Sequence, residues 1–156
     1  MPLWVRDARK DDVELLFDIR TSVLENHQSR EELASLGITA ESIARMLTTD
    51  AKAWICEIDG QPVGFSMANQ RERTVFALFV RPEHEGRGAG RTLLKAAEQW
   101  LFSHGASEIW LSTGSDPALR SHGFYRCMGW QPSRSSEDGS IIYIRHAQDA
   151  GIIRTM

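Results

Sequence analysis

The sequence predicts an α/β fold, in which a mixed and mostly antiparallel sheet is flanked by helices. Two Asp-Gly pairs, at 59–60 and 138–139, each stand between strand-like segments and are typical of tight hairpin turns. Several helix-cap signals occur near the start of the chain. A long helix with one apolar stripe, over residues 93–101, lies between two further strand-like segments, and a strand-helix-strand unit makes its two strands parallel.

The first third of the chain predicts a short strand and three helices. Residues 4–6 form the strand, because they combine an aromatic and a β-branched side chain. Each helix is preceded by a polar residue that can accept a hydrogen bond from the free N–H groups of its first turn. The predicted caps are Asp11 with Glu14 in capping-box spacing, Ser29 with Glu32 in the same spacing before a helix that ends at Gly37, and Thr39 before residues 40–47.

The middle of the chain changes from helical to strand periodicity. Residues 53–58 and 62–68 are strand-like, and Asp59-Gly60 between them predicts a type I′ hairpin. After a polar turn, residues 74–80 form a third strand. An antiparallel meander is therefore expected here.

The last part of the chain alternates helix and strand. The helix with the apolar stripe ends at Gly105, and residues 108–113 are expected to form a buried strand parallel to residues 74–80. Asp116-Pro117 opens a further helix that ends before Gly129. The closing strands are predicted at 130–135 and 140–145, joined through Asp138-Gly139.

Composition and charge restrict the class of protein. The 156 residues are 42% hydrophobic and 25% charged, which is within the globular range, and residues 1–156 are expected to form one domain. The net charge of −3 argues against a nucleic-acid binder. Residues 1–60 carry 12 acidic and 7 basic side chains, whereas residues 61–156 carry 9 and 11. A ligand with an anionic and a cationic part fits this division, and so does a solvated surface.

The sequence predicts a soluble cytoplasmic protein without a metal site. Cys56 and Cys127 form no CxxC pair and are expected to be buried free thiols in a reducing compartment. No apolar run approaches the about 20 residues that span a bilayer, and the first residues have no signal-peptide core. The five histidines have no metal-ligand spacing.

A glycine-rich turn before the long helix is the most informative segment. Gly86, Gly88 and Gly90 alternate there, with Arg87 and Arg91 beside them. Free N–H groups and the positive end of the helix dipole bind anions at a helix N-terminus, and glycines let a ligand approach the backbone closely. The P-loop and dinucleotide patterns are both absent, because neither glycine spacing is met.

Two segments together resemble one known family. Residues 80–94, Val-Arg-Pro-Glu-His-Glu-Gly-Arg-Gly-Ala-Gly-Arg-Thr-Leu-Leu, are similar to the acyl-CoA motif of the GCN5-related N-acetyltransferase (GNAT) family, V-x-P-x-x-(Q/R)-x-x-G-x-(G/A) with paired leucines after it. Residues 124–130, Phe-Tyr-Arg-Cys-Met-Gly-Trp, are similar to the family's F-Y-x-x-x-G-F/W block. The predicted order of elements also matches over nearly the whole chain.

The resemblance implies a GNAT-like fold whose sheet is splayed between two central parallel strands, with acetyl-CoA as co-substrate in the gap. Carried over by position, the backbone of Leu78, Phe79 and Val80 would meet the pantetheine and the thioester, and an N–H near Phe79 would stabilise the reaction's oxyanion. The residues implied to hold the cofactor through the glycine-rich turn are Glu85, Gly86, Arg87, Gly88, Ala89, Gly90 and Arg91.

The resemblance also implies a catalytic residue and contains two departures. Tyr125 stands where the family often places the acid that protonates the leaving CoA thiolate, and the alternative is a packing residue. Glu85 replaces the usual Gln or Arg, and it is expected to turn outward or to pair with Arg87 or Arg91. Ser115 is expected to contact the cofactor in place of an Asn that many members carry in this segment.

The general base and the acceptor are not identified by any motif. Candidate bases are Glu57, Glu72, His84, Glu31 and Glu32, and each is also explained as a surface residue. The N-terminal helices and the closing hairpin are expected to recognise the acceptor, and the acidic excess of residues 1–60 suits a cationic amine. A weaker similarity over residues 23–39 points to small-molecule acetyltransferases of the tabtoxin-resistance type.

We therefore expect an acetyl-CoA-dependent N-acetyltransferase that acts on the primary amine of a small molecule by direct attack in a ternary complex. Two alternatives stay open: acetylation of a protein N-terminus or lysine, and a catalytically weak CoA-binding regulatory domain. The expected partners are a small-molecule amine or a peptide, with no nucleic acid and no membrane. The resemblance also allows a homodimer, which members often form through a sheet edge or the closing strands.

Overall fold

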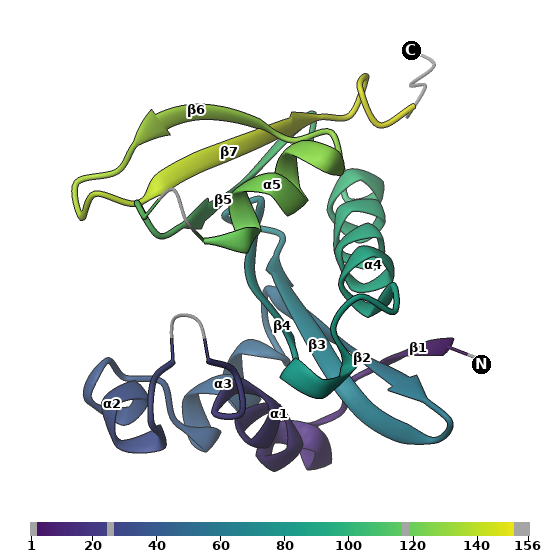
Figure 1. The fold of residues 1–156 in the computed structure, drawn as a ribbon, viewed down its shortest axis with the longest axis vertical. Helices are drawn as coiled ribbons and strands as arrows, with labels where there is room; N and C mark the ends of the chain where they lie inside the picture. Colours follow the sequence, from purple (N-terminus) through teal and green to yellow (C-terminus); the bar gives the residue numbers. More distant parts are fainter. Residues whose placement is uncertain (1–2, 25–26, 117–118, 152–156) are drawn as a thin grey trace.

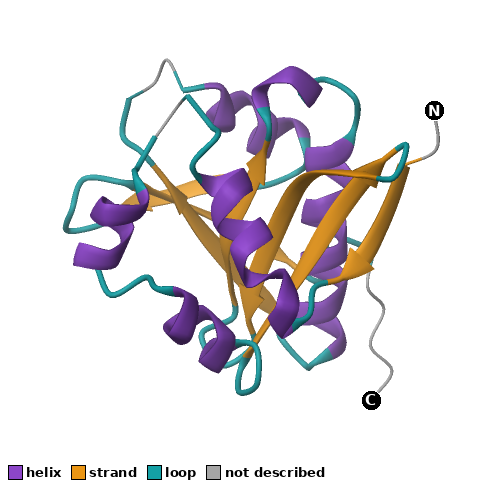
Figure 2. Ribbon diagram, turned by 90° about the horizontal axis from the view of Figure 1, so that it is seen from below, coloured by secondary structure: helices purple, strands orange, loops and turns teal. Residues whose placement is uncertain are grey.

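Residues 3–24, 27–116 and 119–151 are described by the computed structural model. Their seven strands form one sheet in the order β1-β2-β3-β4-β5-β7-β6, with helices on both sides (Figure 1 and Figure 2). The strands are β1 (Leu3–Asp7), β2 (Ala51–Ile58), β3 (Gln61–Asn69), β4 (Thr74–Val80), β5 (Glu108–Thr113), β6 (Gln131–Ser135) and β7 (Ile141–His146). The helices are α1 (Val13–Arg20), α2 (Arg30–Ser35), α3 (Ala40–Met46), α4 (Ala89–Ser103) and α5 (Arg120–Cys127), with short 3-10 turns η1 (Lys10–Asp12) and η2 (Pro82–His84).

Strands β4 and β5 are the parallel pair of the described sheet, and they separate after one point of contact. Every other neighbouring pair is antiparallel. Only Thr74 and Trp110 are in register between β4 and β5, where the Thr74 hydroxyl donates to the Trp110 carbonyl at 2.8 Å. The predicted fold class, a mixed and mostly antiparallel sheet splayed between two central parallel strands, is therefore confirmed.

Two hydrophobic cores lie on the two faces of the sheet. Helix α4 covers one face with its apolar stripe, in which Leu93 and Leu94 are fully buried. Helices α1, α2 and α3 cover part of the other face, around Phe65 and Met67 of β3. Gly64 lets α4 approach closely, because a Cβ at that position would lie 3.1 Å from a Leu93 methyl carbon and 2.8 Å from a strand carbonyl.

The helix starts of the N-terminal third are partly as predicted. The capping box at Ser29 and the cap at Thr39 are confirmed, because each hydroxyl accepts from the backbone N–H three residues on. The predicted Asp11 cap is wrong. It is the Asp12 carboxylate that accepts from the Arg9 backbone N–H at 2.8 Å, and α1 begins after it at Val13.

Three expectations for the C-terminal half are wrong: the start of one helix, the burial of one strand and the burial of Cys127. The helix predicted to open at Asp116-Pro117 begins at Arg120, and residues 117–118 lie outside the described residues. Strand β5 is buried on one face only, and Trp110 on its other face is 36% exposed. Cys56 is buried as predicted, but Cys127 is exposed at the end of α5. The face of β5 that carries Trp110 and the end of α5 that carries Cys127 are thus open to solvent.

A buried carboxylate holds the C-terminal part of the sheet against α4. Glu98 of α4 accepts a hydrogen bond from the Trp130 indole at 3.0 Å. Its other oxygen lies 3.0 Å from Arg145 Nε, as an ion pair rather than an aligned hydrogen bond. Burial raises the pKa of Glu98, and the Trp130 and Arg145 contacts oppose that shift. These contacts tie the residue before β6 and strand β7 to α4.

Candidate functional site

The free edge of β4 presents backbone groups to the gap between β4 and β5. Gly64 and Val80 are opposite each other, and the Arg81 N–H donates to the Val63 carbonyl at 2.7 Å. In an antiparallel pair this pattern makes Phe79 and Phe65 the residues that exchange hydrogen bonds, and alternate residues point the other way. The backbone N–H groups of Leu78 and Val80 therefore face the gap, while that of Phe79 faces β3.

The glycine-rich turn leaves open space beside its backbone at the N-terminus of α4. Gly86 and Gly88 have φ of +79° and +90°, which L side chains rarely adopt, and nothing lies within 4 Å of a Cβ at either position. The first turn has neither an acidic residue nor a side-chain cap. Among the described residues, its free N–H groups thus have no side-chain acceptor, which is the arrangement that binds an anion.

A cleft of about 600 Å³ joins the edge of β4 to this turn. Of the residues predicted to hold the cofactor, the cleft is lined by Leu78, Phe79, Val80, Glu85, Gly86, Gly88, Ala89, Gly90 and Arg91. The predicted Arg87 and Ser115 do not line it. We refer to this space as the cofactor cleft; its backbone donors and its anion-binding end fit a pantetheine arm with a pyrophosphate.

The Glu85 carboxylate is neutralised from an unexpected side. It pairs with the guanidinium of Arg120, at the start of α5, and not with Arg87 or Arg91 as predicted. Arg120 also lines the cofactor cleft. The ion pair joins α5 to the glycine-rich turn and leaves Arg91 without a carboxylate partner among the described residues. The negative charge that Glu85 brings to the cleft is thus balanced by Arg120.

Tyr125 lies at the inner end of the cofactor cleft. It is 9% exposed, and its ring stands edge-on to Phe124 at a centroid distance of 5.5 Å. No hydrogen bond of its hydroxyl is found within the described residues. Burial raises the pKa of Tyr125 to about 12, because the phenolate would lose its hydration. The phenol therefore stays protonated at neutral pH and can act as a proton donor.

A second cleft, of about 720 Å³, lies on the other side of Tyr125. It runs between the free edge of β4, strand β5, the segment that includes His27 and Gln28, and the turn between β6 and β7. We refer to it as the acceptor cleft. It shares four lining residues with the cofactor cleft, namely Leu78, Phe79, Ser121 and Tyr125. The two clefts thus meet where β4 and β5 separate.

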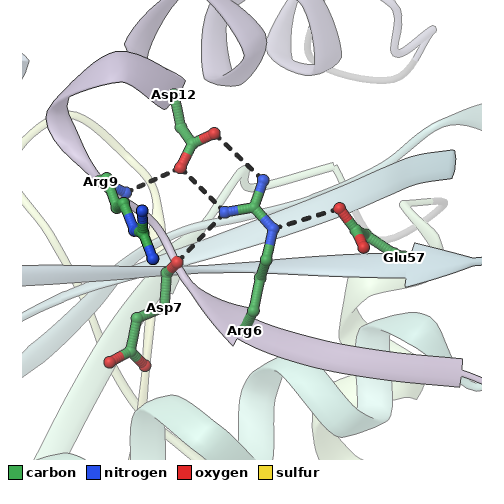
Figure 3. A network of polar contacts seen from close by, with 5 residues as sticks. All are labelled: Arg6, Asp7, Arg9, Asp12 and Glu57. Carbon is green, nitrogen blue, oxygen red and sulfur yellow. Dashed lines mark hydrogen bonds and ion pairs between the residues drawn. The ribbon is translucent and has the colours of Figure 1, made fainter. Parts of the chain in front are cut away.

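The five candidate bases differ in whether they line one of the two clefts. Glu57 lies in a network with Arg6 and Asp12 at the β1–β2 edge, where Arg6 Nε donates to it at 3.1 Å (Figure 3). Glu57, Glu72 and Glu31 line neither cleft. Glu32 lines the acceptor cleft, although its carboxylate accepts from the Ser29 N–H, and His84 lines the cofactor cleft with a buried Nδ1 that has no partner among the described residues.

Sequence reasoning missed several residues of the acceptor cleft. The hydroxyls of Thr113 and Ser121 lie 2.6 Å apart in its lining. Asp138, interpreted only as a turn residue, lines its rim, and Arg20 stands over the Phe79 ring at 4.2 Å. A turn signature was the only indication for Asp138. No local pattern connects Thr113 with Ser121, because β5 and α5 meet only in the folded chain.

His122 fixes the loop that carries this hydroxyl pair. Its Nε2 lies 2.9 Å from the Gly114 carbonyl, and its Nδ1 lies 2.8 Å from the Tyr143 hydroxyl. A carbonyl only accepts, so Nε2 carries the proton and Nδ1 accepts from the buried Tyr143. The end of β5 is thereby tied to β7.

Two further features, a metal site and a membrane-spanning helix, are not found in the described residues. No group of three or more metal-ligating side chains occurs in the part of the chain that the structure describes, which covers all five histidines but not every acidic residue. In the same residues no helix is both long and apolar enough to cross a membrane.

Comparison with known sequences identifies a family. Residues 13–130 match the Acetyltransferase (GNAT) family. Streptothricin acetyltransferase of Streptomyces lavendulae is 37% identical over 68 residues, which are 44% of this chain and 35% of that protein. Aminoglycoside N(6')-acetyltransferase type 1 of Stenotrophomonas maltophilia is 27% identical over 101 residues, 58% of this chain and 62% of that protein. The matches thus span less than two thirds of each relative's own length.

Solved structures share the whole fold. The PaiA N-acetyltransferase from Thermoplasma acidophilum, in complex with coenzyme A, superposes with a TM-score of 0.79 at 18% identity and covers 94% of this chain and 99% of that one. The ribosomal-protein-S18-alanine N-acetyltransferase from Escherichia coli gives 0.73 at 17% identity, over 93% and 94%. At these identities the likeness concerns the fold alone.

Proposed function

This chain belongs to the acetyltransferase (GNAT) family, and we propose that it transfers the acetyl group of acetyl-CoA to a primary amine of a small molecule by direct attack in a ternary complex. The observation that carries the proposal is the meeting of two clefts at Tyr125, Leu78 and Phe79. An acetyl donor in one cleft and an amine in the other would come together there. Residues 1–156 would form one acetyltransferase domain; the cytoplasmic location and the homodimer stay predictions.

The cofactor cleft would hold acetyl-CoA mainly through the backbone. The N–H groups of the first turn of α4 would bind the pyrophosphate, with Arg91 adding charge. The edge groups of Leu78 and Val80 would bond the pantetheine arm as a neighbouring strand would. Acetyl-CoA supplies an activated acetyl group on a thiol leaving group, and the site residues need only position it and handle protons.

Two groups at the junction would serve the reaction itself. A backbone N–H of Leu78 or Val80, pointing into the gap, would stabilise the negative charge that develops on the acetyl oxygen. Tyr125 would donate its proton to the departing thiolate, because its hydroxyl is protonated at neutral pH and it lines both clefts. Ser121 lines both clefts and is held by Thr113 at 2.6 Å, so its hydroxyl would orient the incoming amine or a water.

The choice of a small amine rests on the acceptor cleft and on the relatives. Glu32 and Asp138 on the cleft lining suit a cationic acceptor that is attracted before it loses its proton. Burial in the cleft favours the neutral amine, and a water can take the proton. Two relatives are named as acetyltransferases of streptothricin and of an aminoglycoside, both small molecules.

The proposal is tested by binding and by thiol release. Acetyl-CoA should raise the melting temperature of the protein, and a panel of small amines should release CoA in its presence. If acetyl-CoA does not bind by calorimetry, the proposal fails. If it binds but neither small amines nor peptides release CoA, a regulatory CoA-binding role replaces it, and release with peptides alone would assign a protein acceptor.

A further inference from the structure

A third cavity opens from the acceptor cleft toward the N-terminal helices. It measures about 250 Å³ and lies between α1, α2, α3 and the strands β3 and β4. Five residues line both spaces, among them Phe76, Ala77 and Phe79 of β4. We refer to this cavity as the side pocket. Its mouth therefore lies on the strand whose edge would carry the acetyl group.

The depth of the side pocket is apolar. The eight residues that line it without lining the acceptor cleft are all leucine, isoleucine, methionine or phenylalanine, such as Leu33, Ile43 and Phe65. Each of these three is no more than 8% exposed. A charge moved into such surroundings without a partner costs several kcal/mol, whereas a hydrocarbon group gains about 25 cal/mol for each Å² removed from water.

The charged side chains and the imidazole of His27 line the acceptor cleft or the mouth of the side pocket. Glu32, His27 and Asp138 line the acceptor cleft but not the side pocket. Arg20 lies at the shared mouth, where its guanidinium covers the Phe79 ring at 4.2 Å. A ligand that fills both spaces thus has its polar part in the cleft and an uncharged hydrocarbon part in the pocket.

We propose that the acceptor is a primary amine with an apolar group, an alkyl chain of about six carbons or a phenyl ring, which occupies the side pocket during acetyl transfer. The size follows from the cavity, since a dry cavity of about 150 Å³ already holds benzene in an engineered protein and this one is larger. The proposal rests on the acetyl transfer proposed above and names its substrate class.

The opening of the pocket favours the acceptor over a lengthened acyl group as its occupant. Among the five shared residues, only Phe79 also lines the cofactor cleft, whereas all five line the acceptor cleft. The pocket is thus continuous with the space for the amine. A longer acyl chain would have to turn around Phe79 to enter it.

The first experiment measures CoA release from acetyl-CoA with a series of linear amines from ethylamine to hexylamine. These amines differ little in basicity, so chain length changes mainly the buried apolar area. The kcat/KM should rise about fourfold for each methylene. With 1,6-diaminohexane the gain should be absent, because its second ammonium would be buried. A flat series, or an equal gain with the diamine, overturns the proposal.

Two variants test whether the preference for long amines arises in the side pocket. Met46 lines only the side pocket, so Met46→Trp should lower the preference for hexylamine over ethylamine at least tenfold. Ala77→Leu narrows the mouth and should act in the same direction. Arg45→Trp places the same indole on the neighbouring exposed position of α3, outside the pocket, and should keep the preference. Melting temperatures confirm that each variant folds; a preference that survives in both pocket variants contradicts the proposal.

Two further measurements separate this proposal from the proposed function. Calorimetry gives the affinity of the CoA-bound protein for N-ethylacetamide and N-hexylacetamide without any turnover. Tighter binding of the hexyl compound is expected even if no amine releases CoA, and equal affinities overturn the side pocket as a hydrocarbon site. If hexanoyl-CoA is preferred over acetyl-CoA while amine length has no effect, the pocket holds the acyl chain and the proposal is wrong.

Discussion

The two clefts that meet at Tyr125 are built in different ways. The cofactor cleft takes most of its lining from one stretch of chain, residues 78–91, and offers backbone groups and glycines. The acceptor cleft collects side chains from α1, β4, β5, α5 and the β6–β7 turn. A backbone site therefore corresponds to a continuous motif. A side-chain site depends on which distant segments the fold brings together.

The two clefts also differ in charge. Arg91 and Arg120 line the cofactor cleft, where Glu85 is already paired with Arg120. The acceptor cleft carries Glu32 and Asp138, with Arg20 near its base. The opposite balances fit an anionic donor and a cationic acceptor. The net negative charge of the acceptor cleft comes from Asp138 and not from the acidic excess of residues 1–60, because Arg20 offsets Glu32.

The largest effect is expected where the clefts meet. Tyr125→Phe removes the proton donor and should lower kcat about 100-fold, since general acid catalysis contributes about 10²–10⁴-fold. The affinity for acetyl-CoA should change less than twofold, because the ring remains. The comparison variant is Tyr143→Phe, which removes the other phenol, outside both clefts, together with its bond to His122; its loss of kcat should be much smaller. Equal losses in the two variants would exclude Tyr125 as the acid.

The pH dependence of the same residue is a second test. The folded-state pKa of Tyr125 is raised to about 12, so the folded protein holds this proton more firmly than the unfolded chain. The contribution of Tyr125 to stability is thus fully present below the unfolded pKa of about 10 and is lost as the pH rises from there toward about 12. Tyrosine absorbance should show a phenol that titrates near pH 12 and is absent in Tyr125→Phe. Titration of that phenol near pH 10 would contradict its burial.

A backbone change should affect the cofactor cleft alone. Gly88→Ala places a Cβ in the open anion-binding turn at a φ of +90°, and acetyl-CoA affinity should fall about tenfold. Strain at a positive φ also costs about 1–2 kcal/mol of stability. Gly105→Ala, at φ +97° beyond the other end of α4, provides the same strain without the site. Calorimetry should find the affinity loss in the first variant only.

The two arginines of the glycine-rich turn should contribute unequally to the affinity for acetyl-CoA. Arg91 lines the cofactor cleft and Arg87 does not, so Arg91→Ala should weaken acetyl-CoA binding about fivefold and Arg87→Ala less than twofold. Both effects should shrink as salt is added, because the charges are exposed. Binding measured at two salt concentrations tests this order, and a larger loss in Arg87→Ala would reverse the assignment.

The smallest effect is expected on the acceptor side. Glu32→Gln keeps the capping hydrogen bond to Ser29 and removes one negative charge from the cleft. The KM for a cationic amine should rise about twofold, as is typical of an exposed charge, with no change in acetyl-CoA binding. Glu31→Gln removes the neighbouring charge outside the cleft and is the control. Indistinguishable KM values would show that Glu32 does not attract the acceptor.

The sequence by itself determined the order of the elements, and its resemblance to the GNAT family implied the splayed sheet and the residues proposed to hold the cofactor. The reason is that the turn at Gly86 and Gly88, the Asp59-Gly60 hairpin and the stripe of α4 are local patterns of backbone freedom and periodicity. Where a local signal competed with a distant partner, the prediction failed. Asp12 caps in place of Asp11 while binding Arg6, and Glu85 pairs with Arg120 rather than with its neighbours.

Only the tertiary structure decided which side chains line the acceptor cleft and where β4 and β5 separate. The Thr113–Ser121 pair and the side pocket join elements that are distant in sequence, so no spacing in the chain encodes them. The register between β3 and β4 was also decided by the tertiary structure. It directs the N–H groups of Leu78 and Val80 toward the gap and that of Phe79 toward β3. Backbone preferences act over a few residues, whereas a side-chain site is fixed by packing across the whole molecule.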